Sequence, residues 1–259
     1  MNCRICKTSC RKVFSAVLMK KYTAEYYQCP HCGCLQLENI NHLDEAYKQT
    51  ITQSDVGLLA RNYRYTEQLA PFFYYSGLKD GLFLDYGGGY GVFSRLMRDI
   101  GFDFYSCDPY TKNIFSTSFS SDLCGNFSAV TALEVFEHLP NPLETLFNLL
   151  NYSDTIAIGT NLLESHPDKN YENWSYLGLE HGQHITFYSL DTMKVLAEKF
   201  HLHLYTDKKY LTVLSRKKFS SRAAGKLALR HRFSILFLEY VKCKMKSKII
   251  SDYELEKSK

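Results

Sequence analysis

The sequence predicts an α/β fold in which a small cysteine-rich segment precedes a parallel sheet with helices on both faces. Six of the nine cysteines fall within residues 1–34, a glycine-rich turn follows a short apolar run, and apolar runs then alternate with helix-like stretches. The chain has 259 residues, of which 45% are hydrophobic and 22% are charged. Such a chain can bury a sizeable core, which excludes disordered and collagen-like proteins.

Two features of the hydropathy pattern bear on localisation. The sequence has no run of about 18 apolar residues, the length that a helix needs to span a membrane. Its N-terminal residues also lack the apolar stretch of a secretory signal. We therefore expect a cytoplasmic protein.

Residues 1–40 are the expected metal-binding domain, because Cys3-x-x-Cys6 and Cys29-x-x-Cys32 lie 22 residues apart. Each Cys-x-x-Cys turn lets two thiolates reach one ion, so the two turns supply the four sulfurs of a tetrahedral zinc site. The protein then fills every coordination position, which makes the zinc structural rather than catalytic. The intervening sequence predicts the strands of a zinc ribbon. Alternative ligands in the same segment are Cys10, His31 and Cys34.

Residues 41–80 are expected to form a helical linker or lid between the ribbon and the main domain. The stretch from 61 to 75 is rich in aromatic residues and has a helix-like pattern. Tyr47, Arg61 and Asn62 come before the sheet and could close over a pocket at its edge. For any one of them, an ordinary place in a helix is the simpler interpretation.

The first predicted strand covers residues 81–86, and a glycine-rich turn follows it. Residues 87–91 read Gly-Gly-Gly-Tyr-Gly and lead into a helical pattern that starts at Val92. A strand, a glycine turn and a helix open a nucleotide-type α/β unit, in which the glycines let the backbone approach a ligand closely. The dinucleotide fingerprint needs a glycine where Val92 stands, and Asp85 would repel a pyrophosphate. Asp85 instead suits a ligand that carries an ammonium group.

Two further acids follow the next two predicted strands. Asp108 ends the strand at 104–108, where its carboxylate can accept hydrogen bonds from ribose hydroxyls. Glu134 follows the apolar strand at 129–133. The remaining pattern predicts helices at 143–150 and 190–200, and strands at 155–160, 202–206 and 210–215.

Three motifs resemble those of class I S-adenosylmethionine (SAM)-dependent methyltransferases. They are Asp85-x-Gly87-x-Gly89-x-Gly91, the acid Asp108, and Glu134-x-x-Glu137-His138. The resemblance covers residues 82–215 and implies a Rossmann-like methyltransferase sheet of seven strands, the last of them antiparallel, with SAM as the cofactor. In such proteins another acid lies near the adenine, and Asp122 is the candidate for it.

The resemblance also implies a role for each matched residue. Gly87 and Gly89 would line the methionine part of SAM, with Asp85 near its amino group. Asp108 would hold the ribose, and Glu134 would close the other side of the cofactor. With the cysteine ribbon in front, the whole chain resembles a subgroup of these enzymes that is encoded with sugar and surface-polysaccharide biosynthesis functions. Some of its members methylate a carbon of a nucleotide-linked deoxysugar, which implies a sugar substrate.

A loop of about 25 residues follows the strand at 155–160, and its length suggests that it covers a substrate. Methyl transfer to oxygen or carbon needs a proton removed, and histidine is the favoured base near neutral pH. His181 and His184 are the candidate general bases, and Glu180 is the candidate residue that orients them. Related sugar enzymes carry Glu-His pairs in a similar loop. Either histidine could instead cap the following helix or pack within the loop. His138 is a third candidate base, which could instead brace the cofactor loop.

The C-terminal segment, residues 219–259, is strongly basic. Residues 216–248 contain eleven Lys or Arg and one acid, a net charge of +10, whereas residues 249–259 carry −1 and residues 1–215 carry −5. Apolar residues at helical spacing predict a basic amphipathic helix. This helix could lie on the anionic inner membrane surface, dock a partner chain or dock on its own domain. Its basic positions include Lys226, Arg230, Arg232, Lys242, Lys244, Lys246 and Lys248.

We therefore expect a SAM-dependent methyltransferase with domains at 1–40, 41–80, 81–218 and 219–259. It would transfer a methyl group in line to a sugar, nucleotide-linked or in a surface glycan, with a histidine as general base. The alternatives are a zinc-ribbon nucleic-acid-binding protein and an RNA or protein methyltransferase. Nucleic acid is not an expected partner, because the ribbon lacks alternating aromatic and basic residues. No Asn/Asp-Pro-Pro-Tyr sequence follows the strand at 129–133, which argues against methylation of a base amino group.

Overall fold

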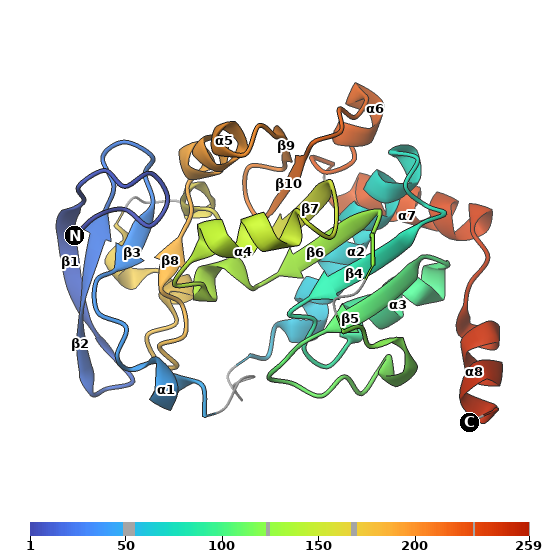
Figure 1. The fold of residues 1–259 in the computed structure, drawn as a ribbon, viewed down its shortest axis with the longest axis horizontal. Helices are drawn as coiled ribbons and strands as arrows, with labels where there is room; N and C mark the ends of the chain where they lie inside the picture. Colours follow the sequence, from blue (N-terminus) through green and yellow to red (C-terminus); the bar gives the residue numbers. More distant parts are fainter. Residues whose placement is uncertain (49–54, 123–124, 167–169, 230, 259) are drawn as a thin grey trace.

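The computed structural model describes residues 1–48, 55–122, 125–166, 170–229 and 231–258 (Figure 1). Two sheets lie side by side in it. A small sheet at the N-terminal end of the molecule is built from β1, β2, β3 and β8, and a larger sheet runs through the middle between helices. The long segment after β7 passes from the larger sheet to the smaller one.

The larger sheet contains six strands within the described residues, in the order β5-β4-β6-β7-β10-β9. Strands β5, β4, β6 and β7 are parallel, and β10 is antiparallel to both of its neighbours. The antiparallel strand agrees with the expected methyltransferase topology. The strands are β4 (Leu82–Tyr86), β5 (Asp103–Cys107), β6 (Ala129–Leu133), β7 (Thr155–Gly159), β9 (His203–Thr206) and β10 (Leu211–Ser215).

This count of six, taken over the described part of the chain, differs from the predicted seven. At the β5 edge, where a further strand would stand, one isolated parallel bridge joins Ser106 and Ser120. The preceding segment is held by local side-chain bonds, because the Asn113 side chain accepts from the Ser116 backbone N–H and donates to the Ser116 carbonyl. Such local bonds compete with the ladder of a strand.

Helices cover both faces of the larger sheet, and its strands are buried on both sides. One face packs against α2 (Leu58–Tyr75), α3 (Val92–Ile100) and α7 (His231–Lys244), and the other against α4 (Pro142–Leu149) and α5 (Leu190–Lys199). Successive residues of β7 alternate between the two cores: Ile156 and Ile158 face α4 and α5, and Ala157 faces α2. Because β5, β4, β6 and β7 are parallel, their carboxyl ends all lie at one edge of the sheet.

The small sheet contains β1 (Arg11–Leu18), β2 (Tyr22–Gln28), β3 (Leu35–Leu37) and β8 (Thr186–Phe187), of which β8 comes from the long segment after β7. Arg4 joins the N-terminal strands to the segment after β7, because its guanidinium donates to the carbonyls of Leu37 and Ile185, both at 2.8 Å. The hydroxyl of Ser189, the N-cap of α5, donates to the Cys32 carbonyl at 2.7 Å. The cysteine-rich segment thus packs directly on the predicted substrate loop.

The C-terminal helices are α6 (Ser221–Ala224), α7 and α8 (Ile249–Lys257). Leu238 and Val241 of α7 are buried against α2, and Asp252 of α8 forms ion pairs with Arg95 and Arg98 of α3. Of the three alternatives for the basic segment, the structure shows docking on its own domain. Arg230 lies outside the described residues. Among the helices that the structure describes, none has both the length and the apolar character to cross a bilayer.

Candidate active site

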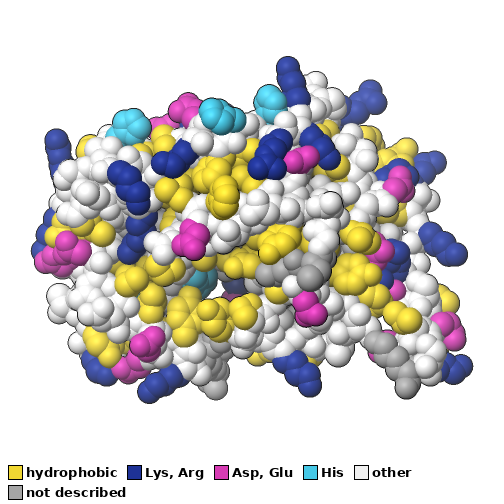
Figure 2. Space-filling model, viewed as in Figure 1, with side chains coloured by type: hydrophobic (Ala, Val, Ile, Leu, Met, Phe, Trp, Pro, Cys, Tyr) yellow, Lys and Arg dark blue, Asp and Glu magenta, His cyan; other side chains and the backbone are white. Residues whose placement is uncertain are grey.

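A cavity of about 750 Å³ lies at the carboxyl ends of β4, β5 and β6, where open α/β sheets bind ligands. Its size is in the range of small-molecule sites. The lining comes from the turn after β4, the segments after β5 and β6, α2 and the residue Asp55 before it, and the segment 175–184. Tyr47, Arg61 and Asn62 line it as well. Figure 2 shows a hollow near the middle of the face seen in Figure 1, with hydrophobic side chains at its rim.

The turn after β4 is closely packed around Gly87 and Gly88, where a side chain would meet its neighbours. Gly87 has a φ of +70°, and a Cβ on it would lie 2.6 Å from the Val135 side chain. A Cβ on Gly88 would lie 2.4 Å from Ser106 Oγ and 2.6 Å from Asp85 Oδ2. The turn therefore lies directly over the Asp85 carboxylate, with its backbone facing the cavity.

Asp85, at the end of β4, is 1% exposed and accepts a 2.7 Å hydrogen bond from the Thr131 hydroxyl. Burial raises the pKa of Asp85 to about 7. The described residues provide no ion pair to this carboxylate, although it lines the cavity. A cationic group in the cavity would supply the missing partner.

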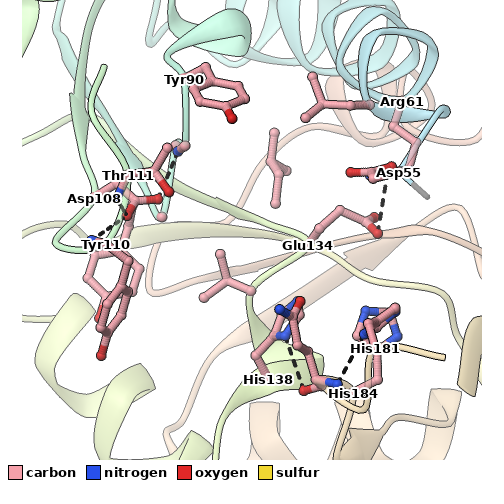
Figure 3. Close-up of a pocket in the computed structure, with 18 of the residues that line it drawn as sticks. Asp55, Arg61, Tyr90, Asp108, Tyr110, Thr111, Glu134, His138, His181 and His184 are labelled. Atoms are coloured by element: carbon pink, nitrogen blue, oxygen red, sulfur yellow. Dashed lines mark hydrogen bonds and ion pairs between the residues drawn. The ribbon is translucent and has the colours of Figure 1, made fainter. Parts of the chain in front are cut away.

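Asp108 follows β5 and is held in place by backbone amides. Its carboxylate accepts from the N–H groups of Gly89 at 2.9 Å, Tyr110 at 2.8 Å and Thr111 at 2.9 Å (Figure 3). A carboxylate has about four acceptor positions, and these three bonds leave Asp108 one position for a ligand hydroxyl. Asp122 lines a smaller cavity of about 520 Å³ that shares Asp108 with the main one.

Glu134 directly follows β6 and has a φ of +55°, which is unusual for a side-chain-bearing residue. Its carboxylate accepts from the Tyr65 hydroxyl at 2.5 Å and lies 3.5 Å from Arg61 Nε. Burial raises the pKa of Glu134. Arg61 also forms an ion pair with Asp55 at 2.7 Å, so α2 and Asp55 before it hold this wall of the cavity in place.

Three histidines form another wall of the cavity, opposite Asp108 and Tyr110 (Figure 3). The His184 ring lies between the other two, with centroids 4.8 Å from His138 and 4.9 Å from His181. Burial lowers the pKa of His138 to about 4, lowers that of His184 well below its ordinary value, and also lowers that of His181. All three rings are therefore neutral at neutral pH.

Backbone hydrogen bonds fix the tautomer of each ring. His184 Nδ1 lies 2.6 Å from the Tyr176 carbonyl, and His138 Nδ1 lies 3.2 Å from the Gln183 carbonyl. A carbonyl only accepts, so both Nδ1 atoms carry the proton and both Nε2 atoms carry a lone pair. His181 is the reverse, because its Nδ1 accepts from the Gln183 N–H at 3.0 Å. Its Nε2 therefore carries the proton and acts as a donor.

Glu180, His181 and His184 all line the cavity, as does Glu134. The contacts that orient the two rings come from Gln183 and Tyr176 rather than from Glu180, whose negative charge favours the protonated form of His181. Orientation of a histidine by Glu180 stays a prediction. Of the two predicted bases, His184 is the one whose Nε2 can accept a proton.

Glu137 lies next to the cavity-lining His138, and the sequence predicted no role for it beyond its place in a motif. It lies in a short 3₁₀ helix, Phe136–His138, and is fully buried behind the histidines. Its Oε1 accepts from the Tyr176 hydroxyl at 2.5 Å. Burial raises the pKa of Glu137 to about 8. The spacing Glu134-x-x-Glu137-His138 was the available signal, but only the fold shows which way each side chain points.

A family model described as a methyltransferase domain matches residues 59–206. The chain belongs to this methyltransferase family. As a member, it is a SAM-dependent methyltransferase. A comparison with curated protein sequences found no match.

Two solved structures have a similar fold. An O-methyltransferase family protein from Burkholderia thailandensis superposes with a TM-score of 0.51 at 12% identity, over 68% of this chain and 63% of that chain. TnmH superposes with a TM-score of 0.50 at 12% identity, over 68% of this chain and 61% of that chain. The methyltransferase thus spans about three fifths of the length of each. At this identity the likeness shows the fold alone.

The glycine turn and its acids fit SAM. A Cβ on Gly88 would fill the cradle over Asp85, and no described residue gives the buried Asp85 carboxylate the cationic partner that the amino group of SAM would provide. Asp108 would accept from the ribose hydroxyls. When bound, SAM supplies an electrophilic methyl group on a sulfonium.

The four cysteines predicted as ligands lie together at the N-terminus. Their sulfurs are within 4.8 Å of one another, with separations of 3.6 Å for Cys3–Cys32, 3.4 Å for Cys6–Cys29 and 3.7 Å for Cys6–Cys32. Sulfurs bound at about 2.3 Å to one tetrahedral ion lie roughly 3.8 Å apart. The geometry therefore fits zinc, and within the described residues Cys10, His31 and Cys34 do not join this group.

Proposed function

We propose that this methyltransferase transfers the methyl group of SAM to a sugar, nucleotide-linked or part of a surface glycan. The observation that carries this proposal is the wall opposite Asp108, where His184 and Tyr176 lie beside Glu180 in one cavity with the glycine turn. Aromatic faces next to hydrogen-bonding groups suit the two sides of a sugar ring. The sequence resemblance to sugar-modifying relatives points to the same substrate class.

The chemistry follows from the two walls of the cavity. Asp85 and Asp108 would hold the amino group and ribose of SAM. SAM would supply its methyl group to a sugar hydroxyl by in-line displacement, with the electron pair of the broken C–S bond left on sulfur. The hydroxyl proton goes to His184 Nε2, which bears the lone pair. Arg61 and Tyr65 keep Glu134 in place between the walls.

Zinc bound by Cys3, Cys6, Cys29 and Cys32 would brace the substrate wall. The Cys32 carbonyl accepts from the hydroxyls of Ser189 and Thr192, at 2.7 and 2.8 Å, so the second cysteine turn is bonded to the start of α5. Loss of zinc would release this contact and loosen the segment that carries His184. The enzyme would act in the cytoplasm, and the basic tail would stay docked on the domain.

Cofactor binding measured by calorimetry tests the first part of the proposal. Asp108→Ala should weaken SAM binding roughly 10- to 100-fold, the value of a hydrogen-bonded charged group. Asp80→Ala is the matched control, because Asp80 has an 82% exposed side chain far from the turn, and it should bind SAM as the wild type does. Equal affinities for wild type and Asp108→Ala would contradict the assignment.

Mass spectrometry tests the substrate class. The enzyme and SAM are incubated with a panel of nucleotide sugars and glycan fragments, and each product is checked for one added methyl group. Methylation of a sugar that disappears in Asp108→Ala is the expected result. Methylation of RNA or protein with no sugar modified would favour the alternative substrates.

A further inference from the structure

A second group of metal-type ligands lies in the active-site wall. Among the described residues, one ligand atom each of Glu137, His138 and His184 lies within 4.8 Å of the others. Ligand atoms at about 2.1 Å from one ion lie roughly 3 to 4 Å apart, so a small closure of these side chains would bring them to one ion. The group is separate from the four cysteines, which belong to the ribbon.

The hydrogen bonds around this group leave one free acceptor on each residue. His138 and His184 both donate Nδ1–H to a backbone carbonyl, which turns the lone pair of Nε2 away from the backbone. No described residue forms a hydrogen bond to either Nε2. Histidine ligands of metals are held in this way, by a carbonyl at the other ring nitrogen.

The carboxylate supplies the independent observation. Glu137 is fully buried, and the Tyr176 hydroxyl donates to its Oε1, whereas its Oε2 has no hydrogen-bond partner among the residues that the structure describes. A buried polar atom without a partner is costly, and a packed cluster of histidine and tyrosine rings alone would leave this cost uncompensated. A cation shared with the two histidines would remove it.

We propose that Glu137, His138 and His184 bind a divalent transition-metal ion at the substrate end of the cavity. Two imidazole nitrogens and one carboxylate oxygen suit Zn²⁺, Fe²⁺ or Co²⁺ better than Mg²⁺, which prefers oxygen ligands. His138 and His184 line the cavity and Glu137 lies behind them, so the open coordination positions face the ligand space. This inference rests on the proposed function, and it specifies how the substrate would be bound.

The substrate class follows from the open positions. Three protein ligands leave room for two adjacent oxygens, so a vicinal diol of a sugar can chelate the ion. Coordination lowers the pKa of the bound hydroxyl, whose proton leaves to solvent water. The resulting alkoxide attacks the sulfonium methyl, a C–O bond forms as the C–S bond breaks, and a neutral ether and thioether remain. His184 then acts as a ligand instead of a base, and oxygen rather than carbon or nitrogen is methylated.

Cobalt titration of the full-length protein, stripped of metal by a chelator, tests this inference without any substrate. Wild type should bind two equivalents of Co²⁺, of which one shows thiolate charge-transfer absorption and the other does not. His184→Ala and Glu137→Gln should weaken the thiolate-free equivalent by at least the roughly 10- to 100-fold that loss of a supporting contact costs a metal site. His203→Ala, an exposed histidine on β9, is the matched control and should keep both equivalents.

The outcomes separate this inference from the proposed function. A wild type that binds no thiolate-free Co²⁺, or a Glu137→Gln variant that binds it unchanged, overturns the inference. Glu137→Gln keeps the shape of the side chain, and its SAM affinity and thermal melting show that it is folded. If the metal-free enzyme still methylates a sugar, the proposed function stands without the ion. If the ion binds and no sugar is methylated, the metal site stands and the proposed substrate fails.

Discussion

The two ends of the cavity are built in different ways. The SAM end comes from short stretches around Gly87 and Asp108, and backbone amides and close glycine packing hold it. The substrate end brings together His138, which precedes β7 in the sequence, and His184, which follows it. Tyr47, from a third segment, packs on His138 with ring centroids 6.1 Å apart. One end is set by local sequence and the other by tertiary packing, so each should fail separately when mutated.

The largest expected effect separates catalysis from cofactor binding. His184→Ala removes the Nε2 lone pair at the substrate end, as base or as ligand, and should lower kcat about 10²- to 10⁴-fold. SAM affinity should stay unchanged, because the ring lies away from the glycine turn. His181→Ala is the comparison, since its Nε2 carries a proton, and it should cost less. Equal losses in both variants would show that the two rings act as one packed unit.

The next effect concerns the SAM end. Gly88→Ala places a methyl group 2.4 Å from Ser106 Oγ and 2.6 Å from Asp85 Oδ2, so either these side chains or the turn must shift. A displacement of about 1 Å can cost 10²-fold, so kcat/KM should fall by about that factor, with weaker SAM binding. Gly77→Ala is the control, because it introduces a side chain at a φ of +73° with nothing within 4 Å. It should lower stability but leave SAM binding intact.

A smaller effect is a pH dependence that belongs to the SAM end alone. Burial raises the pKa of Asp85 to about 7, so the carboxyl is mostly protonated at pH 6 and mostly ionised at pH 8. The ammonium group of SAM favours the ionised form, so SAM affinity should rise about tenfold between these pH values. Calorimetry on Asp85→Asn should give weaker binding with a flat profile. A wild-type affinity that falls as pH rises would rule out this contact.

The raised pKa of Asp85 also makes the stability of the fold depend on pH. The folded pKa of Asp85 lies above its ordinary value of 3.8, so the folded state holds this proton more tightly than the unfolded chain. Its contribution therefore favours folding at low pH and is lost as pH rises from about 4 to 7. Urea unfolding of wild type and Asp85→Asn across this window would show the difference.

The last expected effect is on stability and comes from the contact between ribbon and substrate loop. Arg4→Met removes hydrogen bonds to the Leu37 and Ile185 carbonyls and should cost about 1–3 kcal/mol in the free energy of unfolding. Arg11→Met, at an exposed position of β1, should be neutral. Urea unfolding measures both. An unchanged midpoint for Arg4→Met would mean that the loop holds its shape without the ribbon.

The difference between the two ends also explains what the sequence could predict. The strand–glycine–helix pattern, Asp108 and Glu134 are local signals, and the parallel sheet around them is confirmed. The seventh strand is not found among the described residues, where bonds between Asn113 and Ser116 hold part of the segment after β5. The role of Glu137 and the opposite tautomers of His181 and His184 depend on contacts between distant segments, which periodicity does not encode. The pairing of β8 with β3 also depends on contacts between distant segments.

The pairing of β3 with β8 has a consequence for biosynthesis. Leu35 pairs with Phe187, so the small sheet lacks its last strand until about 150 more residues have left the ribosome. At about 5–20 residues per second, that delay is roughly 10 to 30 seconds. During it the open edge of β3 is a site for wrong pairing with other nascent chains. Early capture of zinc by the first 32 residues would keep this half-built sheet in shape until its partner strand arrives.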